Sequence, residues 1–377
     1  MPETSSSPLR ILHGVRSPIG GIIRHILDLA NGQIERGHHV GIVSGNLTGG
    51  ARADVMLAEI APRLSLGLHR LPIRREPHPA DITAATNHLG LIRRLKPHIL
   101  HGHGAKSGIF FRLKSASRTA IRVYTPHGGS LHYPPESFKG AFYARLERAF
   151  INRTELFLFE SKFARDTYAR FVGEPTAMVR CVFNGVSSSE FDPVVVDNDA
   201  TDLLFIGQFL QIKGTDILLN AVARLHASGR PVTLTLAGDG QEINALKAQI
   251  QRLDLTNSVR FLGFVNPRFA FTKGRVLVVP SRGDSMPYVV IEAAAAGIPT
   301  IAANVGGIPE IFGPYSSALF SPNSADAIAE AVGKTLDDLD AARGRARLLR
   351  ERISEHFSQD AMVDGIIAAY RDALNAR

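Results

Sequence analysis

The chain has 377 residues, of which 45% are hydrophobic and 21% charged, and its formal net charge is +8. This composition is typical of a folded globular chain long enough for two domains of ordinary size, and it disfavours disorder except at the ends. The single cysteine, Cys181, excludes an internal disulfide. The sequence contains no run of about 18 apolar residues, so we expect no membrane-spanning helix. The amino-terminal MPETSSSPLR lacks the basic start of a signal peptide, so we expect a cytoplasmic protein.

Charge is divided unevenly along the chain. Residues 1–190 hold 25 Lys and Arg against 14 Asp and Glu, a net +11, whereas residues 191–377 hold 18 against 21, a net −3. A basic half is suited to an anionic membrane surface or to a nucleic acid. No aromatic-basic RNA motif or helix-turn-helix signal supports a nucleic acid. An ordinary solvated, Arg-rich surface is the alternative interpretation.

In chain order, short apolar runs typical of buried strands alternate with amphipathic segments of helical length, which is the pattern of parallel α/β sheets. The expected strands of the first series are residues 10–15, 39–45, 98–104, 121–128, 156–161 and 178–186. Residues 187–202, rich in Ser, Asp and Pro, indicate a linker. The second series is 202–208, 232–240, 259–265, 275–281 and 299–304, and a final helix is expected in 358–377. The pattern predicts two doubly wound domains, with ligand bound where the carboxyl ends of their strands face a cleft.

The first glycine turn lies in RSPIGGIIRHIL, residues 16–27, where an expected strand ends and a helix begins. Gly20 and Gly21 would leave backbone amides open at the start of that helix, and such amides bind anions. The glycine spacings of the chain match neither the three-glycine dinucleotide fingerprint nor the P-loop. A dehydrogenase and a P-loop NTPase are therefore disfavoured.

Two later segments carry charges at expected strand ends. In FIGQFLQIKGTDILL, residues 205–219, Lys213 directly precedes Gly214 and a helix, where it can bind a phosphate that the helix dipole favours. A solvent-facing loop lysine is the alternative. In PSRGDSMPYVVIE, residues 280–292, Asp284 lies in a loop and Glu292 well inside the next helix. Carboxylates accept hydrogen bonds from vicinal hydroxyls, so this pair could bind a ligand that carries several hydroxyls. The alternative is that Asp284 caps the helix and that Glu292 is a partly exposed helix residue.

Two further motifs lie at strand ends. NVGGIPEI, residues 304–311, predicts a glycine turn that leads into another amide-rich helix start. HGHG, residues 101–104, places His101 and His103 close together, as in a metal site. No third ligand is spaced with this pair, so we expect no metal there.

The ordered set of motifs resembles that of retaining glycosyltransferases of the family 4 type (glycosyl transferases group 1). The motifs are PIGG, RGHHV, HGHG, TPHGG, FNGV, IGQ with KG, AGDG, FLGF, PSRGDSMPYVVIEAAAAGIPTIA and GGIPE. The resemblance covers essentially the whole chain. It implies the GT-B fold, in which two Rossmann-like domains face a central cleft and a C-terminal helix closes back toward the N-terminal domain. The implied parts are an acceptor domain at 1–190, a nucleotide-sugar domain at 191–356 and the returning helix at 357–377.

The resemblance also implies roles for single residues. Glu292 would bind the ribose hydroxyls of the nucleotide, and Asp284, where the family usually has Glu, would contact hydroxyls of the donor sugar. Lys213 would neutralise the departing phosphate. His127 of TPHGG would lie beside the reacting sugar, and a buried histidine bonded to its own loop is the alternative.

The phosphate assignment rests on further positions. By the same resemblance, Gly20 and Gly21 would lie against the diphosphate and the acceptor. The family usually has Arg directly after the strand-end glycine, whereas here Gln208 follows Gly207, which removes one fixed charge from the leaving diphosphate. Arg282 is close in sequence to the acidic site and is a candidate replacement; a surface arginine is the alternative.

The implied reaction is transfer of a hexose from a UDP- or GDP-linked donor with retention at the anomeric carbon. The leaving diphosphate would help to deprotonate the acceptor, and neither a metal ion nor another cofactor is expected. The basic stretches 69–78 and 91–98 suit docking on the anionic inner face of the cytoplasmic membrane, so the expected acceptor is an envelope glycolipid, lipopolysaccharide or exopolysaccharide precursor. A GT-B sugar-nucleotide epimerase and a non-catalytic sugar-nucleotide-binding protein stay open as alternatives.

Overall fold

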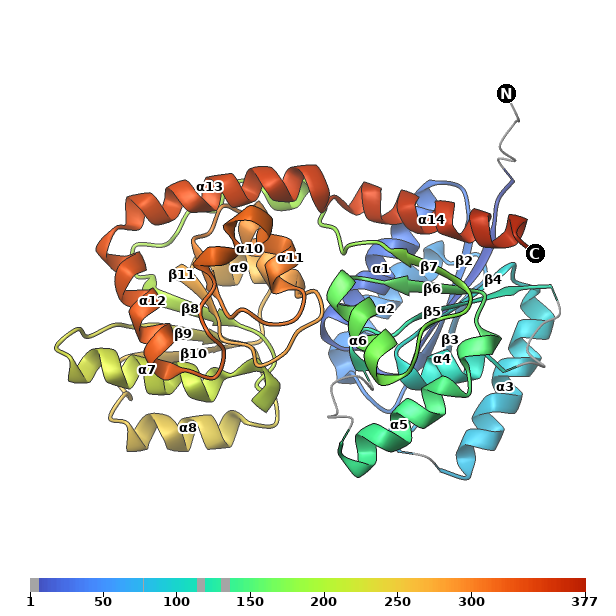
Figure 1. Ribbon diagram of the computed structural model, residues 1–377, viewed down its shortest axis with the longest axis horizontal. Helices are drawn as coiled ribbons and strands as arrows, with labels where there is room; N and C mark the ends of the chain where they lie inside the picture. Colours follow the sequence, from blue (N-terminus) through green and yellow to red (C-terminus); the bar gives the residue numbers. More distant parts are fainter. Residues whose placement is uncertain (1–6, 77, 114–118, 130–135) are drawn as a thin grey trace. The chain divides into compact units, whose positions relative to one another are not determined.

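The computed structural model describes residues 7–76, 78–113, 119–129 and 136–377 (Figure 1). Residues 1–6 of the amino-terminal stretch and Pro77 of the basic stretch 69–78 lie outside the described residues. The chain forms two compact units: unit 1 comprises Met1–Asn184 with Gln359–Arg377, and unit 2 comprises Gly185–Ser358. The change of unit therefore lies just before the predicted linker at 187–202, in which a 3₁₀ turn at Ser188–Phe191 precedes the first strand of unit 2.

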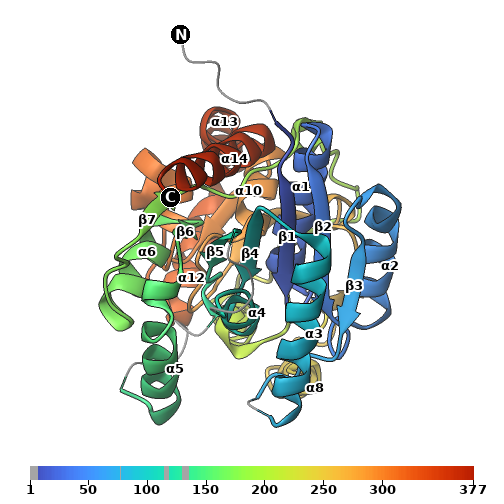
Figure 2. The same ribbon diagram turned by 90° about the vertical axis from the view of Figure 1, so that its right-hand side faces the viewer.

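Unit 1 is built on a seven-stranded sheet in the order β3-β2-β1-β4-β5-β6-β7. All of its strand pairs are parallel. The strands are β1 (Arg10–Val15), β2 (His39–Gly45), β3 (Leu68–Leu71), β4 (Ile99–His103), β5 (Ile121–Thr125), β6 (Leu156–Phe159) and β7 (Met178–Cys181). The central strands β1 and β4 are buried almost throughout, as expected of parallel strands with helices on both faces (Figure 2).

The α-helices of unit 1 are α1 (Gly20–Glu35), α2 (Gly50–Ile60), α3 (Ala80–Leu95), α4 (Ala105–Phe111), α5 (Phe138–Arg148), α6 (Lys162–Phe171) and the C-terminal α14 (Gln359–Asn375). Helix α14 belongs to this unit because it packs on α1 and on the sheet. Gly32 of α1 permits the approach, since a Cβ there would lie 2.6 Å from Val363 Cγ2. Arg36 fixes the contact at its edge through ion pairs with Asp360 and Asp364.

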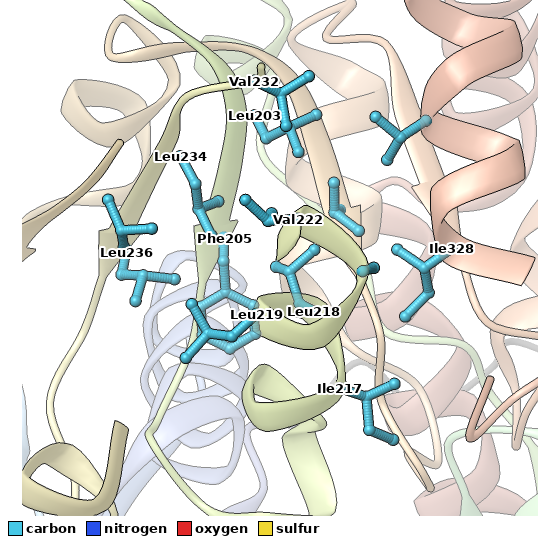
Figure 3. Packing of buried hydrophobic residues seen from close by; sticks show 14 of the residues in the cluster. Leu203, Phe205, Ile217, Leu218, Leu219, Val222, Val232, Leu234, Leu236 and Ile328 are labelled. Carbon is cyan, nitrogen blue, oxygen red and sulfur yellow. The ribbon is translucent and has the colours of Figure 1, made fainter. Parts of the chain in front are cut away.

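Unit 2 is built on a five-stranded parallel sheet in the order β10-β9-β8-β11-β12. Its strands are β8 (Thr201–Ile206), β9 (Leu234–Ala237), β10 (Val259–Gly263), β11 (Gly274–Val279) and β12 (Thr300–Ala302). Its α-helices are α7 (Thr215–Ala227), α8 (Ile243–Arg252), α9 (Pro267–Phe271), α10 (Tyr288–Ala295), α11 (Ile308–Phe312), α12 (Ala325–Asp337) and α13 (Leu339–His356). Leu203 and Phe205 of β8 pack with Leu218 and Val222 of α7 in the core of this unit (Figure 3).

The predicted α/β class with two doubly wound sheets is confirmed. Each expected strand overlaps an observed one, and β8 and β11 begin one residue earlier than expected. β3 was not expected, because its four residues, LHRL, carry no continuous apolar run. Among the residues that the structure describes, none of the helices combines the length and the apolar character that a membrane crossing needs.

Candidate active site

The strand orders locate a switch point in each unit. In unit 1 the strands after β1 are added on one side of it as far as β3, and β4 then pairs with the other side of β1. In unit 2 the same change of side occurs between β8 and β11. Loops at the carboxyl ends of such neighbouring strands splay apart and form the ligand sites of open α/β sheets. The predicted site residues divide between the units: Gly20, Gly21 and His127 lie in unit 1, and Gly207, Gln208, Lys213, Arg282, Asp284 and Glu292 lie in unit 2.

In unit 2 the structure brings Lys213 and Asp284 together. Lys213 ends a 3₁₀ turn (Gln211–Lys213) after β8, and Asp284 lies in the loop after β11. Gly214 has a φ of +71°, and a Cβ there would lie 2.0 Å from the Pro280 carbonyl oxygen, so only glycine lets the two loops come this close. Lys213 Nζ lies 2.5 Å from Asp284 Oδ2, and the side chains are 26% and 15% exposed. The pair is thus accessible to a ligand but shielded from bulk water.

Asp284 is held from behind by the GGIPE turn. The Gly307 N–H donates to the Asp284 carbonyl oxygen at 3.0 Å. Gly306 has a φ of +60°, and a Cβ there would lie 1.6 Å from the same oxygen. The sequence predicted an amide-rich helix start at this turn, but α11 has only five residues and one turn amide is already used to position Asp284. Gly306 and Gly307 indicated in the sequence that the backbone turns tightly here, but the sequence could not show that the turn contacts Asp284.

Glu292 and Arg282 lie on either side of Asp284 in the sequence. Glu292 is in the second turn of α10, and only 7% of it is exposed. Arg282 binds Asp216, the second residue of α7, through two hydrogen bonds of 2.8 and 2.7 Å. Burial raises the pKa of Asp216, but the hydrogen bonds and charge of Arg282 outweigh it, and the net pKa lies below its usual value. Arg282 is therefore already committed to a carboxylate, and it can replace the missing arginine of the diphosphate site only if this pair opens.

Gly207 and Gln208 lie directly after β8, and the backbone of Gly207 packs closely against the loop that follows β9. The Gly207 N–H donates to the Ala237 carbonyl oxygen at 3.0 Å, and a Cβ on Gly238 would lie 1.9 Å from the Gly207 carbonyl oxygen. Gln208 is partly buried. The backbones of Gly207 and Gly238 are therefore too close for a side chain on Gly238. Glycines of this kind are common where a ligand contacts the backbone directly.

In unit 1 the predicted His127 belongs to a group of hydrogen-bonded histidines. It follows β5 with a φ of +51°, an unusual conformation for a residue other than glycine and one that is often found at functional sites. His127 Nε2 lies 2.9 Å from His103 Nδ1, and His103 Nε2 lies 3.0 Å from His13 Nδ1. His13 Nε2 in turn lies 2.8 Å from Gln33 Oε1. A continuous chain of hydrogen bonds therefore joins α1 to the loop after β5.

Two more histidines complete this group. His25 lies on α1 just after the Gly20–Gly21 turn, with its Nδ1 atom 3.0 Å from Asn184 Oδ1. His101 lies between two hydroxyls, Tyr370 Oη at 2.7 Å and Thr125 Oγ1 at 2.8 Å. No third ligand is spaced with His101 and His103 in the sequence, but β1, α1 and the loop after β5 bring three more histidines close to them in space. Sequence spacing shows only neighbours on one segment.

Burial keeps these five rings neutral at pH 7. Desolvation lowers the pKa of His13 to about 4 and that of His127 to about 3. For His25, His101 and His103 burial is also the largest cause, reinforced by the neighbouring rings, and each pKa lies well below 6.5. A neutral imidazole carries one donor and one acceptor nitrogen, which is what a chain of ring-to-ring hydrogen bonds requires.

Comparisons with known proteins decide the family. The model described as Glycosyltransferase Family 4 matches residues 19–190, and the model described as Glycosyl transferases group 1 matches residues 200–338. Together the matches span most of the chain. The chain belongs to the family 4, group 1 glycosyltransferases.

Individual relatives agree with this membership. The glycogen synthase of Mycobacterium tuberculosis is 24% identical over 93% of this chain and 91% of its own length. Among solved structures, a sucrose-phosphate synthase from Thermosynechococcus elongatus superposes with a TM-score of 0.81 at 20% identity, covering 98% of this chain and 100% of the other. Anabaena HepE in complex with UDP-glucose gives 0.79 at 18% identity, covering 97% and 100%. These neighbours show that this glycosyltransferase has the GT-B fold.

Proposed function

We propose that this glycosyltransferase moves a hexose from a UDP- or GDP-linked donor, with retention at the anomeric carbon and without a metal ion, to an envelope glycolipid or polysaccharide precursor. The Lys213–Asp284 pair at the switch point of unit 2 carries the proposal. The pair offers an ammonium group for a diphosphate and carboxylate oxygens for sugar hydroxyls, only 2.5 Å apart. One donor molecule that presents both groups can engage both residues.

The proposed step has a simple balance. The bond from the anomeric carbon to the diphosphate oxygen breaks, and the electron pair leaves with the diphosphate. The acceptor oxygen bonds to the same face of that carbon, and its proton goes to the leaving diphosphate. Negative charge therefore grows on the diphosphate, where Lys213 would stabilise it as a metal ion does in other enzymes.

The surface of unit 1 supports an acceptor held at an anionic membrane. Arg74 and Arg75 follow β3, Arg93 and Arg94 lie in the last turn of α3, and all four are exposed. The side chain of Ile82 on α3 is 73% exposed, and Phe138 and Phe142 on α5 are 89% and 46% exposed. In Figure 2, α3 and α5 project from the same end of the unit. Basic residues and exposed aromatic rings together are typical of a surface that docks on lipid headgroups.

A donor and acceptor panel tests the reaction. The protein is incubated with UDP- and GDP-linked hexoses, with and without membrane extracts that contain the acceptors, and the configuration of the product is read by NMR. We expect an acceptor-dependent product with the configuration of the donor. Conversion of the donor without an acceptor would instead support an epimerase, and nucleotide binding without turnover would support a non-catalytic protein.

Vesicle binding tests the docking surface separately. Replacing four arginines with Ser should reduce binding to anionic vesicles steeply at low salt, since each basic residue near such a surface contributes about 1 kcal/mol. The four are Arg74, Arg75, Arg93 and Arg94. A control with the same loss of charge replaces exposed arginines of unit 2, namely Arg252, Arg343, Arg345 and Arg347, and should keep its binding. Equal binding by both variants would refute docking through unit 1 and favour a soluble acceptor.

A further inference from the structure

Three of the clustered histidines are arranged as a set of metal ligands. His25, His103 and His127 come from α1, the end of β4 and the loop after β5, and each offers one ring nitrogen within 4.8 Å of the other two. We propose that these three residues bind a divalent transition-metal ion such as Zn²⁺, and that the bound ion inhibits sugar transfer. Imidazole nitrogens are preferred ligands for Zn²⁺, Co²⁺, Ni²⁺ and Cu²⁺, and three of them leave one position of a tetrahedral ion open for water.

The distances require only a small adjustment. A Zn–N bond is about 2.0–2.1 Å, so two nitrogens on one tetrahedral ion lie about 3.3 Å apart. His103 Nδ1 and His127 Nε2 are 2.9 Å apart with a proton between them. An ion takes the place of that proton, which moves to the other nitrogen of its own ring, while the rings separate by a few tenths of an ångström. The third ligand, a ring nitrogen of His25, lies within 4.8 Å of the other two nitrogens, and small side-chain rotations can bring it to the ion.

The outer hydrogen bonds already orient two of the ligands. Donation from His25 Nδ1 to Asn184 Oδ1 places the lone pair of His25 at Nε2. Donation from His103 Nε2 to His13 Nδ1, continued by His13 Nε2 to Gln33 Oε1, places the lone pair of His103 at Nδ1. Metal-binding histidines usually donate their other N–H to such a carbonyl or acceptor, which fixes the tautomer and the ring orientation.

A second set of three, His13, His101 and His103, is less suited to an ion. Tyr370 and Thr125 hold both nitrogens of His101, and His103 and Gln33 hold both nitrogens of His13. Coordination there would break bonds that orient two rings. Coordination by His25, His103 and His127 replaces the His103–His127 bond and keeps the bonds to Asn184 and His13.

The position of His127 explains both access and effect. His127 is partly exposed and Gly129 is exposed, so an ion can reach the site from solvent, whereas His25 and His103 are buried. The inhibitory part rests on the proposed function and on the place beside the reacting sugar that the family resemblance implies for His127. An ion bound to its ring would occupy that place with a positive charge and a water molecule. Transfer that needs no metal and inhibition by Zn²⁺ are therefore compatible.

Metal binding to tag-free protein tests the site without any activity measurement. Co²⁺ is titrated by its visible absorption and Zn²⁺ by calorimetry, and we expect one ion per chain in a tetrahedral environment. His127→Asn is the main variant, because Asn tolerates the left-handed backbone at this position. It should weaken binding at least about 10-fold, the loss typical even of outer partners of a metal site. His25→Asn should act alike. The control His88→Asn removes a buried histidine of α3 outside the group and should bind as the wild type does.

The outcomes separate the possible errors. Absence of a one-to-one complex, or equal affinity in the His127→Asn and His88→Asn variants, overturns the site. Loss of binding in His101→Asn with none in His25→Asn overturns the choice of ligands in favour of the other three. Circular dichroism of each variant establishes that it is folded. Addition of Zn²⁺ during transfer is a separate measurement: binding without inhibition overturns only the inhibitory role, and failure of the transfer assay leaves the metal result untouched.

Discussion

Replacing Gly306 with Ala should destabilise unit 2 and displace Asp284. The new Cβ would lie 1.6 Å from the Asp284 carbonyl oxygen, whereas real Cβ contacts stay beyond 3.0 Å, so the two segments must separate by about 1.4 Å. A non-glycine residue at a φ of +60° costs about 1–2 kcal/mol, loss of the Gly307 hydrogen bond about 1 kcal/mol, and the overlap itself about 1–3 kcal/mol. We expect a total loss of about 3–6 kcal/mol of unfolding free energy.

Gly229→Ala is the matched control for this change. Gly229 lies in the same unit with a φ of +79°, but a Cβ there meets nothing within 4 Å, so only the backbone cost of about 1–2 kcal/mol applies. Because the chain has no Trp, urea unfolding is followed by far-ultraviolet circular dichroism, and the donor affinity is measured beside it. Equal losses of stability in the two variants, or an unchanged donor affinity in Gly306→Ala, would refute the role of this turn in holding Asp284.

Three further predictions concern the donor site. Lys213→Ala should lower turnover more than donor affinity, because charge on the leaving diphosphate grows toward the transition state; equal losses measured by kinetics and calorimetry would make Lys213 only a binding residue. Glu292→Gln should weaken donor binding about 10-fold, since an amide oxygen accepts hydrogen bonds from hydroxyls less strongly than a carboxylate, and an unchanged dissociation constant would remove Glu292 from the site. Transfer should persist in EDTA, and loss of activity that Mg²⁺ or Mn²⁺ restores would contradict the metal-free mechanism.

The strands could be predicted from the sequence because burial leaves a local record. β6 is the continuous apolar run LFLF, and β11 ends in the apolar run VLVV; both are among the buried strands of parallel sheets. β3 left no such record. Its four residues are all partly buried, and Arg70 within it pairs with Asp54 on α2. An edge strand with this composition is defined by its neighbour β2, which lies far away in the sequence.

The two halves of the candidate site differ in the same way. Lys213 and Asp284 lie in loops after strand ends, and Glu292 lies in the helix that follows one. The rule that ligands bind at the carboxyl edge of a parallel sheet made them candidates, and the family resemblance implied their roles. The contact between Lys213 and Asp284 depends on Gly214 and Gly306, whose missing side chains let loops from β8, β11 and β12 meet. The glycines are visible in the sequence, but the atoms that they leave room for are not.

The histidine group shows the same limit most clearly. HGHG and TPHGG drew attention to His101, His103 and His127, but the other two rings carry no signal in their own segments. His13 is one polar residue in a largely apolar strand, and His25 is one residue of an amphipathic helix. β1 and β4 lie side by side in the sheet (Figure 2). Their parallel register pairs His13 with His101 and Val15 with His103, and this alone brings the first three rings together. A positive φ turns His127 toward His103, and α1, which begins right after β1, supplies His25. Because all five rings are uncharged, four of them lie buried in unit 1 without repulsion, with the partly exposed His127 beside them. The group keeps lone pairs that protons or a metal ion can share.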